Sequence, residues 1–180
     1  MDYDIPRIQG TRLFSGFSEL EVRLVFEQCA ELREVTEDQI IIEAGTHGRE
    51  IYYLAEGSVR TEIPLPPYPP AALATLQGPI TFGEISYLDG GERSVTVRAA
   101  APLSLHVIDG QRLDALFLDL PHTQCKLHRN IALSLTDIVR NNTRHFHDGV
   151  MKLRTAQSKA ANQVAGKYYD MISRLAGNIS

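Results

Sequence analysis

The sequence predicts a mainly β protein with flanking α-helices, and two observations lead to this fold class. From Leu32 to Ile108, short apolar runs alternate with glycines and charged pairs at a spacing of roughly 8–12 residues, which is typical of a β-sandwich or β-barrel. Patterns with apolar residues three and four positions apart precede and follow this region, and they predict helices. The chain has 180 residues, 43% of them hydrophobic, so one main domain can bury a core without disulfides or a metal.

The first predicted element is a helix from Ser18 to Ala30. Ser18 is a good N-cap residue, and Glu21 stands three positions later, where it completes a capping box. Such a box satisfies backbone N–H groups that the first helical turn leaves without an acceptor. The apolar face of this helix consists of Leu20, Val22, Leu24, Val25 and Cys29.

Six short strands are predicted after this helix, each a run rich in apolar or β-branched residues. They are Gln39–Glu43, Ile51–Leu54, Val59–Ile63, Ala72–Leu76, Ser94–Ala99 and Leu103–Ile108. A different pattern interrupts them from Pro64 to Pro70, where five residues are prolines. Because proline has no amide donor, this segment is predicted to be an extended hairpin loop outside the sheet. Its PxxP spacing leaves the alternative of a polyproline-type ligand for a partner protein.

Helices are predicted again after Ile108. The first covers residues 109–120 and is interrupted by Pro121, and a longer one covers about 122–147 and ends at Gly149. The apolar stripe of the longer helix consists of Leu127, Ile131, Leu135 and Ile138. A separate amphipathic helix with a basic face is predicted over residues 150–176.

Formal charge is unevenly distributed along the chain. The whole chain carries −4, but residues 149–180 contain five basic residues and one acidic residue, a charge of +4, so the other 148 residues carry −8. An acidic main part argues against a dedicated nucleic-acid-binding protein, and we expect no DNA partner. Too few residues follow Asp148 for a helix-turn-helix domain, which supports the same expectation.

The sequence also predicts a cytoplasmic location. No run of about 18 apolar residues is present, so we expect no membrane span. The first four residues include Asp2 and Asp4, whereas a signal peptide begins with a basic segment. Cys29 and Cys125 form no CxxC motif, which favours two free thiols, with one disulfide as the alternative.

Residues 81–97 are the most informative about function. Gly83 permits a sharp turn from a strand into a short helix, whose first N–H groups make an anion site. Arg93 is suited to a bidentate phosphate contact, and Ser94 adds a hydroxyl donor. The Glu84 carboxylate repels phosphate but accepts a hydrogen bond from a sugar hydroxyl. Together these residues predict a ribose-phosphate pocket, and the alternative is a strand–turn–strand with a surface Glu–Arg ion pair.

The run Phe82-Gly83-Glu84-Ile85-Ser86-Tyr87-Leu88, followed by Arg93-Ser94, resembles the phosphate-binding cassette of the cyclic nucleotide-binding domain family. Residues 13–18, 41–45 and 51–59 resemble further segments of the same family. The resemblance covers about residues 12–142. It implies a cupin-like jelly-roll β-barrel at about residues 32–108, with helices at about 109–147 and a C-terminal amphipathic helix at 150–176.

The resemblance also implies a role for each cassette residue. Gly83 and the amides of the next three residues would approach a cyclic phosphate, Arg93 and Ser94 would bind it, and Glu84 would accept from the ribose 2′-OH. Val95 stands where alanine is usual, and Ile138 lies where a helix covers the base. An apolar cover does not read the edge of a purine, so both cAMP and cGMP stay open. The predicted ligand-binding residues are Phe82, Gly83, Glu84, Ile85, Ser86, Arg93, Ser94, Val95 and Ile138.

The function implied is a non-catalytic regulatory module that binds cAMP or cGMP, needs no cofactor, and signals through its C-terminal helices to an unidentified partner protein. In the family the matching helix forms a dimer seam, which implies a homodimer. Two alternatives use the same fold. One is a ligand-free dimerisation scaffold, and the other is a cupin-like metalloenzyme. The metalloenzyme needs convergent histidines, whereas His47 and His106 are single and far apart in the sequence.

Overall fold

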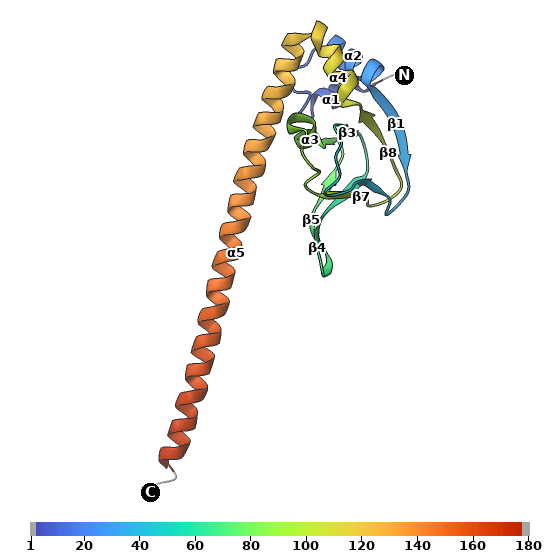
Figure 1. Cartoon of the computed structure of the whole chain (residues 1–180). Coiled ribbons are helices and arrows are strands. Elements are labelled where there is room, and N and C mark those ends of the chain that lie inside the picture. Colours follow the sequence, from blue (N-terminus) through green and yellow to red (C-terminus); the bar gives the residue numbers. More distant parts are fainter. Residues whose placement is uncertain (1–2, 178–180) are drawn as a thin grey trace. The chain divides into compact units, whose positions relative to one another are not determined.

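Two antiparallel four-stranded sheets form the main part of the structure, which is a computed structural model (Figure 1). It describes the backbone of residues 3–177 and the side chains of residues 3–159 and 163. One sheet has the strand order β1-β8-β3-β6, and the other has the order β2-β7-β4-β5. The strands are β1 (Ala30–Val35), β2 (Ile40–Ile42), β3 (Ile51–Leu54), β4 (Ser58–Leu65), β5 (Tyr68–Gln77), β6 (Ile80–Phe82), β7 (Thr96–Ala99) and β8 (Leu103–Ile108).

Helices flank the sheets, as the sequence predicts. They are α1 (Ile5–Gln9), α2 (Glu19–Cys29), α3 (Glu84–Asp89), α4 (Gly110–Asp119) and α5 (Pro121–Gly177). The predicted capping box is confirmed at the start of α2, where Ser18 Oγ accepts from the Glu21 amide at 3.2 Å and the Ser18 amide donates to Glu21 Oε2 at 2.6 Å. The short helix α1 is not predicted, because five residues are too few to show a helical period.

Two groups of buried side chains hold these elements together. The inner faces of both sheets share one apolar core, formed by Val35, Ile42, Tyr52, Leu54, Val59, Phe82, Val97, Ala99, Leu105 and Val107. Helices α1, α2 and α4 lie together at one end of the sheets (Figure 1). Their buried side chains include Ile8, Val22, Val25, Phe26, Leu113 and Phe117.

The predicted strands differ in how well they match the structure. Strands β3 and β8 have the predicted bounds, and β2, β4, β5 and β7 overlap their predicted ranges. Strands β1 and β6 are not predicted. In β1 only Val35 is buried, so the strand has no alternating apolar pattern, and its pairing with β8 along its whole length holds it in place. Strand β6 has three residues, too few for a pattern.

The predicted hairpin is found, but the prediction that residues 64–70 all lie outside the sheet is wrong, because Pro64 lies in β4 and the pair Pro69-Pro70 lies in β5. The two strands stay paired out to Leu65 and Tyr68. Proline is tolerated here because β5 is the edge of its sheet and β4 pairs with β7 only from residue 59 to residue 62. Beyond residue 62 each strand therefore has one open side, where a missing N–H breaks no ladder bond.

A second correction concerns the C-terminal helices. Gly149 does not end a helix, and residues 121–177 form the single helix α5 instead of two helices. A glycine ends a helix when it adopts a positive φ, and Gly149 does not. Within a helix glycine costs only about 1 kcal/mol relative to alanine. No helix of the described residues 3–177 has an apolar stretch long enough to cross a membrane.

The chain divides into two compact units, residues 1–134 and 135–180. The first unit includes the start of α5, where Leu127 is 1% exposed and Ile131 is fully buried. These two residues belong to the core of one chain and are therefore not available to a dimer seam. In the second unit the side chains of residues 160–162 and from residue 164 onward lie outside the described residues, and with them most of the predicted apolar face of residues 150–176.

We expect Ile131→Ala to lower the free energy of unfolding by about 2–5 kcal/mol, because it removes a buried side chain and leaves a cavity. Val139→Ala is the control. Val139 is 63% exposed on the same helix, and its truncation should change stability by less than about 0.5 kcal/mol. Urea denaturation of both variants measures the difference. Equal effects would mean that the first turns of α5 are not part of the core.

We also expect acid to weaken the contact between α2 and α5. Burial acts to raise the pKa of Glu21, but hydrogen bonds from Lys126 and Thr123 outweigh it and lower the pKa to about 2. The resulting stability is present above pH 4.5, the ordinary pKa, and is lost as the pH falls toward 2. Glu21→Gln should therefore cost on the order of 2–3 kcal/mol at pH 6 and much less at pH 3, measured by urea denaturation. The same cost at both pH values would contradict this account.

Candidate functional site

Gly83 makes the turn between β6 and α3, as the sequence predicts. Its φ is +89°, a left-handed conformation that side chains with a Cβ rarely adopt. A Cβ at this position would lie 2.9 Å from the Glu50 carbonyl oxygen and 3.0 Å from Arg93 Nη1. Both the backbone angle and the close contacts therefore require glycine.

Helix α3 follows directly and presents the amides of its first turn. The amides of Glu84, Ile85 and Ser86 stand at positions that have no acceptor within a helix. Ser86 is 3% exposed, and its Oγ donates to the Gly83 carbonyl oxygen at 3.4 Å. Three adjacent backbone donors therefore lie beside the Gly83 turn.

Arg93 contacts this turn directly. Its side chain is 5% exposed, and it forms an ion pair with Glu50 at 2.7 Å. Arg93 Nη1 also donates to the Gly83 carbonyl oxygen at 3.0 Å, and Nη2 to the Glu50 carbonyl oxygen at 3.1 Å. These contacts use three of the five N–H groups of a guanidinium, and they leave Nε–H and one Nη1–H without a partner among them. The predicted surface ion pair between Glu84 and Arg93 is not the arrangement found, because Arg93 pairs with Glu50.

Glu84 is buried, with 8% of its surface exposed, and it has a different partner. Ser134 Oγ on α5 donates to Glu84 Oε1 at 3.1 Å. Glu84 and Ser134 also line a hollow of about 230 Å³ between residues 10–13, which follow α1, and residues 79–81 at the start of β6. Its other lining residues are Gly10, Thr11, Arg12, Leu13, Pro79, Ile80 and Thr81. A buried carboxylate that accepts from a hydroxyl is suited to exchange this partner for a sugar hydroxyl.

The remaining predicted residues lie in different surroundings. Phe82 is buried and stacks on Tyr52, with ring centroids 5.2 Å apart, so its side chain supports the turn from the core. Ser94 is exposed directly after Arg93, and Val95 is half-buried against the core between the sheets. Ile138 lies in the second unit, and its contact with a ligand stays a prediction.

Two residues of this site are missed by the sequence reasoning. Glu50 stands in an ordinary charged pair with Arg49 before β3, and no motif distinguishes it. Ser134 is one polar residue among several on its helix. Both meet the cassette only through the tertiary fold, at 43 and 50 residues of sequence separation from Arg93 and Glu84.

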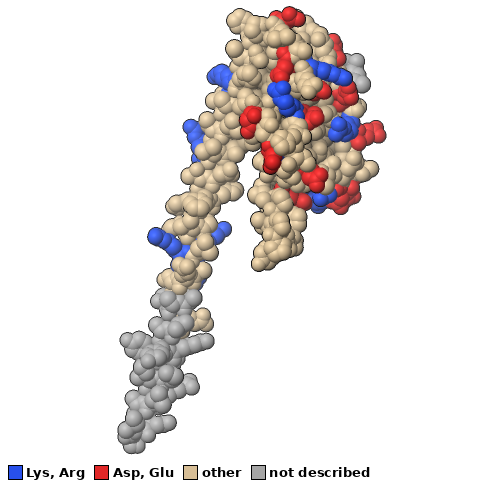
Figure 2. Space-filling model, in the orientation of Figure 1, with Lys and Arg blue, Asp and Glu red and all other residues tan. Residues whose placement is uncertain are grey.

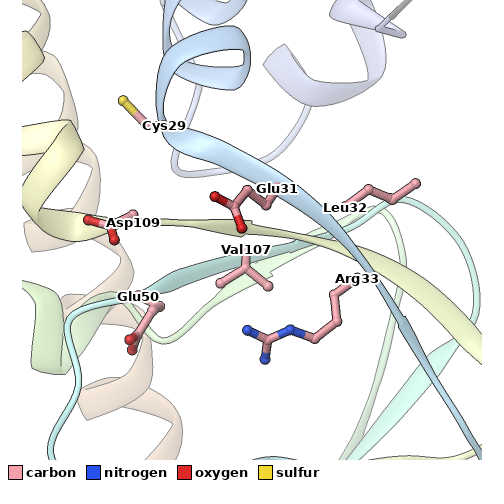
Figure 3. Close-up of a pocket in the computed structure, with 7 residues that line it drawn as sticks. All are labelled: Cys29, Glu31, Leu32, Arg33, Glu50, Val107 and Asp109. Carbon is pink, nitrogen blue, oxygen red and sulfur yellow. The ribbon is translucent and has the colours of Figure 1, made fainter.

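Glu50 also borders a second hollow, on the face of the β1-β8-β3-β6 sheet that carries Val107 of the core. It lines a hollow of about 240 Å³ together with Cys29, Glu31, Leu32, Arg33, Val107 and Asp109 (Figure 3). Figure 3 shows the side chains of Glu31 and Arg33, both from β1, on either side of Val107. Burial raises the pKa of the Cys29 thiol to about 11, so this cysteine is protonated at neutral pH and is a poor nucleophile.

Comparison with known proteins shows that part of the chain matches a protein family. Residues 32–119 match the sequence model of the family described as cyclic nucleotide-binding domain. A protein of Rhodopseudomonas palustris, classed provisionally as a potassium channel protein, is 31% identical over 119 residues. The aligned region is 62% of this chain and 28% of that protein, so the chain spans less than a third of that relative.

Solved structures show the same fold. The catabolite activator protein of Thermus thermophilus is 28% identical, with a TM-score of 0.65 over 75% of this chain and 61% of that one. A cyclic nucleotide-binding domain from Methylobacillus flagellatus has a TM-score of 0.67 at 23% identity, over 76% of each chain. The regulatory domain of Toxoplasma gondii protein kinase A, solved with cAMP, has a TM-score of 0.57 at 18% identity, over 62% of this chain and 42% of that one. The last two likenesses show the fold alone.

Proposed function

We propose that residues 32–119, which match the cyclic nucleotide-binding domain family, bind cAMP or cGMP at the Gly83 turn. The observation that carries this proposal is the buried Arg93 guanidinium, held beside three helix-start amides by Glu50 and the Gly83 carbonyl. A cyclic phosphate placed there would meet two N–H groups of Arg93, the amides of α3 and the hydroxyl of Ser94.

The ribose would be bound by Glu84. In this proposal the 2′-OH takes the place of Ser134 Oγ on the carboxylate. The 2′-OH donates and Glu84 accepts, so the exchange keeps the buried carboxylate hydrogen-bonded. Because Ser134 lies on α5, the exchange would also release one attachment of this helix.

The proposed role is regulatory and non-catalytic, with α5 as the element that carries the signal. The start of α5 is tied to the N-terminal segment by Lys126 and Thr123 on Glu21, and by Asn130 Nδ2 on the carbonyl oxygens of Leu13 and Ser15. Release of Ser134 would therefore act on a helix that is already anchored at its base. A homodimer through the C-terminal helices and a cytoplasmic location stay predictions.

Isothermal titration calorimetry of the full chain tests the binding proposal. The panel contains cAMP, cGMP, 2′-deoxy-cAMP and cyclic dinucleotides. We expect saturable heat with cAMP or cGMP, and about tenfold weaker binding of the 2′-deoxy analogue, which cannot donate to Glu84. No heat with any of these compounds would refute the proposal and favour a ligand-free scaffold on the same fold.

A further inference from the structure

The second unit, residues 135–180, has an exposed apolar stripe that takes no part in the proposed nucleotide site or in the core between the sheets. On α5, Val139 is 63% exposed, Phe146 75%, Val150 37% and Leu153 67%. These residues follow one another at spacings of seven, four and three, which is the a and d spacing of a heptad seam. With Val150 at an a position, Val139, Phe146 and Leu153 occupy successive d positions.

The two rows that flank this seam differ in charge. One row, at the e positions, consists of Arg140, His147 and Arg154, which recur every seven residues. All three are exposed, and the Arg140 side chain is 71% exposed although its Nη1 lies 3.8 Å from Asp137 Oδ1. His147 Nδ1 lies 3.6 Å from Asp148 Oδ1. The other row, at the g positions, consists of Asn142, Gly149, Ala156 and Gln163.

The acidic residues of this stretch do not lie beside the seam. Between residues 135 and 159 they are Asp137 and Asp148, which occupy the b and f positions on the opposite face. Lys and Arg side chains are visible along α5 in Figure 2. The seam is therefore bordered by positive charge on one side and by small or neutral residues on the other.

A second copy of this chain complements the seam poorly. In a parallel pair each e residue faces a g residue of the partner helix, so Arg154 would face a glycine and His147 an asparagine. No ion pair forms in that arrangement. In an antiparallel pair e residues face e residues, which brings arginines together and is unfavourable. The apolar seam fits a second copy, but a second copy offers no carboxylate to Arg140 or Arg154 in either arrangement.

We propose that the seam over residues 139–154 docks an amphipathic helix of a different protein, with glutamate or aspartate in the row that faces Arg140, His147 and Arg154. Such a helix would bury the exposed valines, Phe146 and Leu153 and would form one ion pair with each arginine. Asn142, Gly149 and Ala156 are short, so they let the partner backbone approach closely on the other side. This inference does not depend on a bound nucleotide.

Two synthetic peptides of four heptads test the proposal, with identical valine and leucine seams and either glutamate or lysine at every e and g position. Fluorescence anisotropy of each labelled peptide is followed while the full chain is added at low salt. We expect the acidic peptide to bind on the order of tenfold more tightly than the basic one, because each exposed pair contributes about 0.2–1 kcal/mol. Added salt should reduce this preference.

Charge reversal supplies the matched control. The double variant Arg140→Glu with Arg154→Glu should reverse the preference toward the lysine peptide. The double variant Arg144→Glu with Lys152→Glu changes the net charge equally on the opposite side of α5, and it should keep the preference for the acidic peptide. Phe146→Asp should abolish binding of both peptides, whereas Thr155→Asp on the opposite side should not.

Equal binding of both peptides, or of neither, would overturn the proposal. Sedimentation equilibrium of the chain without peptide tests whether a second copy covers the seam. One outcome is a dimer that Phe146→Asp dissociates and from which the acidic peptide displaces no second copy. Such a dimer would show that a second copy covers the seam, and this result too would overturn the proposal.

Discussion

The Arg93→Ala variant is expected to show no rise in melting temperature with saturating cAMP or cGMP, whereas the native protein is expected to show one, because the proposed function places the phosphate on Arg93. A ligand that binds only the folded state stabilises it by RT ln(1 + [L]/Kd), so a weaker affinity removes the shift. Losing two charge-assisted hydrogen bonds to phosphate costs about 3 kcal/mol or more, which corresponds to at least about a hundredfold in affinity. Differential scanning fluorimetry with and without ligand measures the change.

Arg93 also supports the fold, so the experiment needs controls. Its removal leaves Glu50 and the Gly83 carbonyl without their donor, and we expect the variant to be less stable even without ligand. Arg93→Lys keeps the charge but not the planar fork, and it should retain the fold while binding weakly. Arg98→Ala removes an arginine that pairs with Glu62 at 3.7 Å, away from the cassette, and it should keep the full shift. A full shift in Arg93→Ala would refute the assigned role.

The second large effect is expected from Gly83→Ala. The methyl group would be placed in a left-handed conformation at a cost of about 1–2 kcal/mol, and it would also press on the Glu50 carbonyl and on Arg93. We expect a loss of about 2–4 kcal/mol in the free energy of unfolding, together with weaker ligand binding, because Arg93 must move.

Gly16→Ala is the matched control for this prediction. Gly16 has a similar φ of +78°, but a Cβ there would meet no atom within 4 Å. It should show the conformational cost alone and leave ligand affinity unchanged. Urea denaturation and calorimetry of both variants separate the two contributions. Equal losses of stability and unchanged ligand affinity in both variants would show that the contacts around Gly83 are unimportant.

Features that depend on neighbours in the sequence were predictable. The capping box joins Ser18 to Glu21 within one helical turn, and β3 and β8 have apolar runs with clear ends. The Gly83 turn was also predictable, because its residue type and the cassette that follows it are local. In each case the residues that determine the structure lie a few positions apart, so the sequence contains the whole cause.

Features that depend on distant partners were not predictable. Strand β1 exists because β8 pairs with it, and the prolines fit in β4 and β5 because those strands have open sides. The prediction of a helix end at Gly149 fails because residues on both sides of it are helical and glycine adds only a small cost.

The amino-acid sequence by itself determined the fold class and the position of the Gly83 turn, because these follow from local patterns of turn, charge and apolar residues. Only the tertiary structure decided how the cassette residues are held. It places Glu50 on Arg93, Ser134 on Glu84 and Ile131 in the core. These contacts join residues that are far apart in the chain. Packing brings such residues together, and the spacing of residue types along the sequence does not indicate which of them will meet.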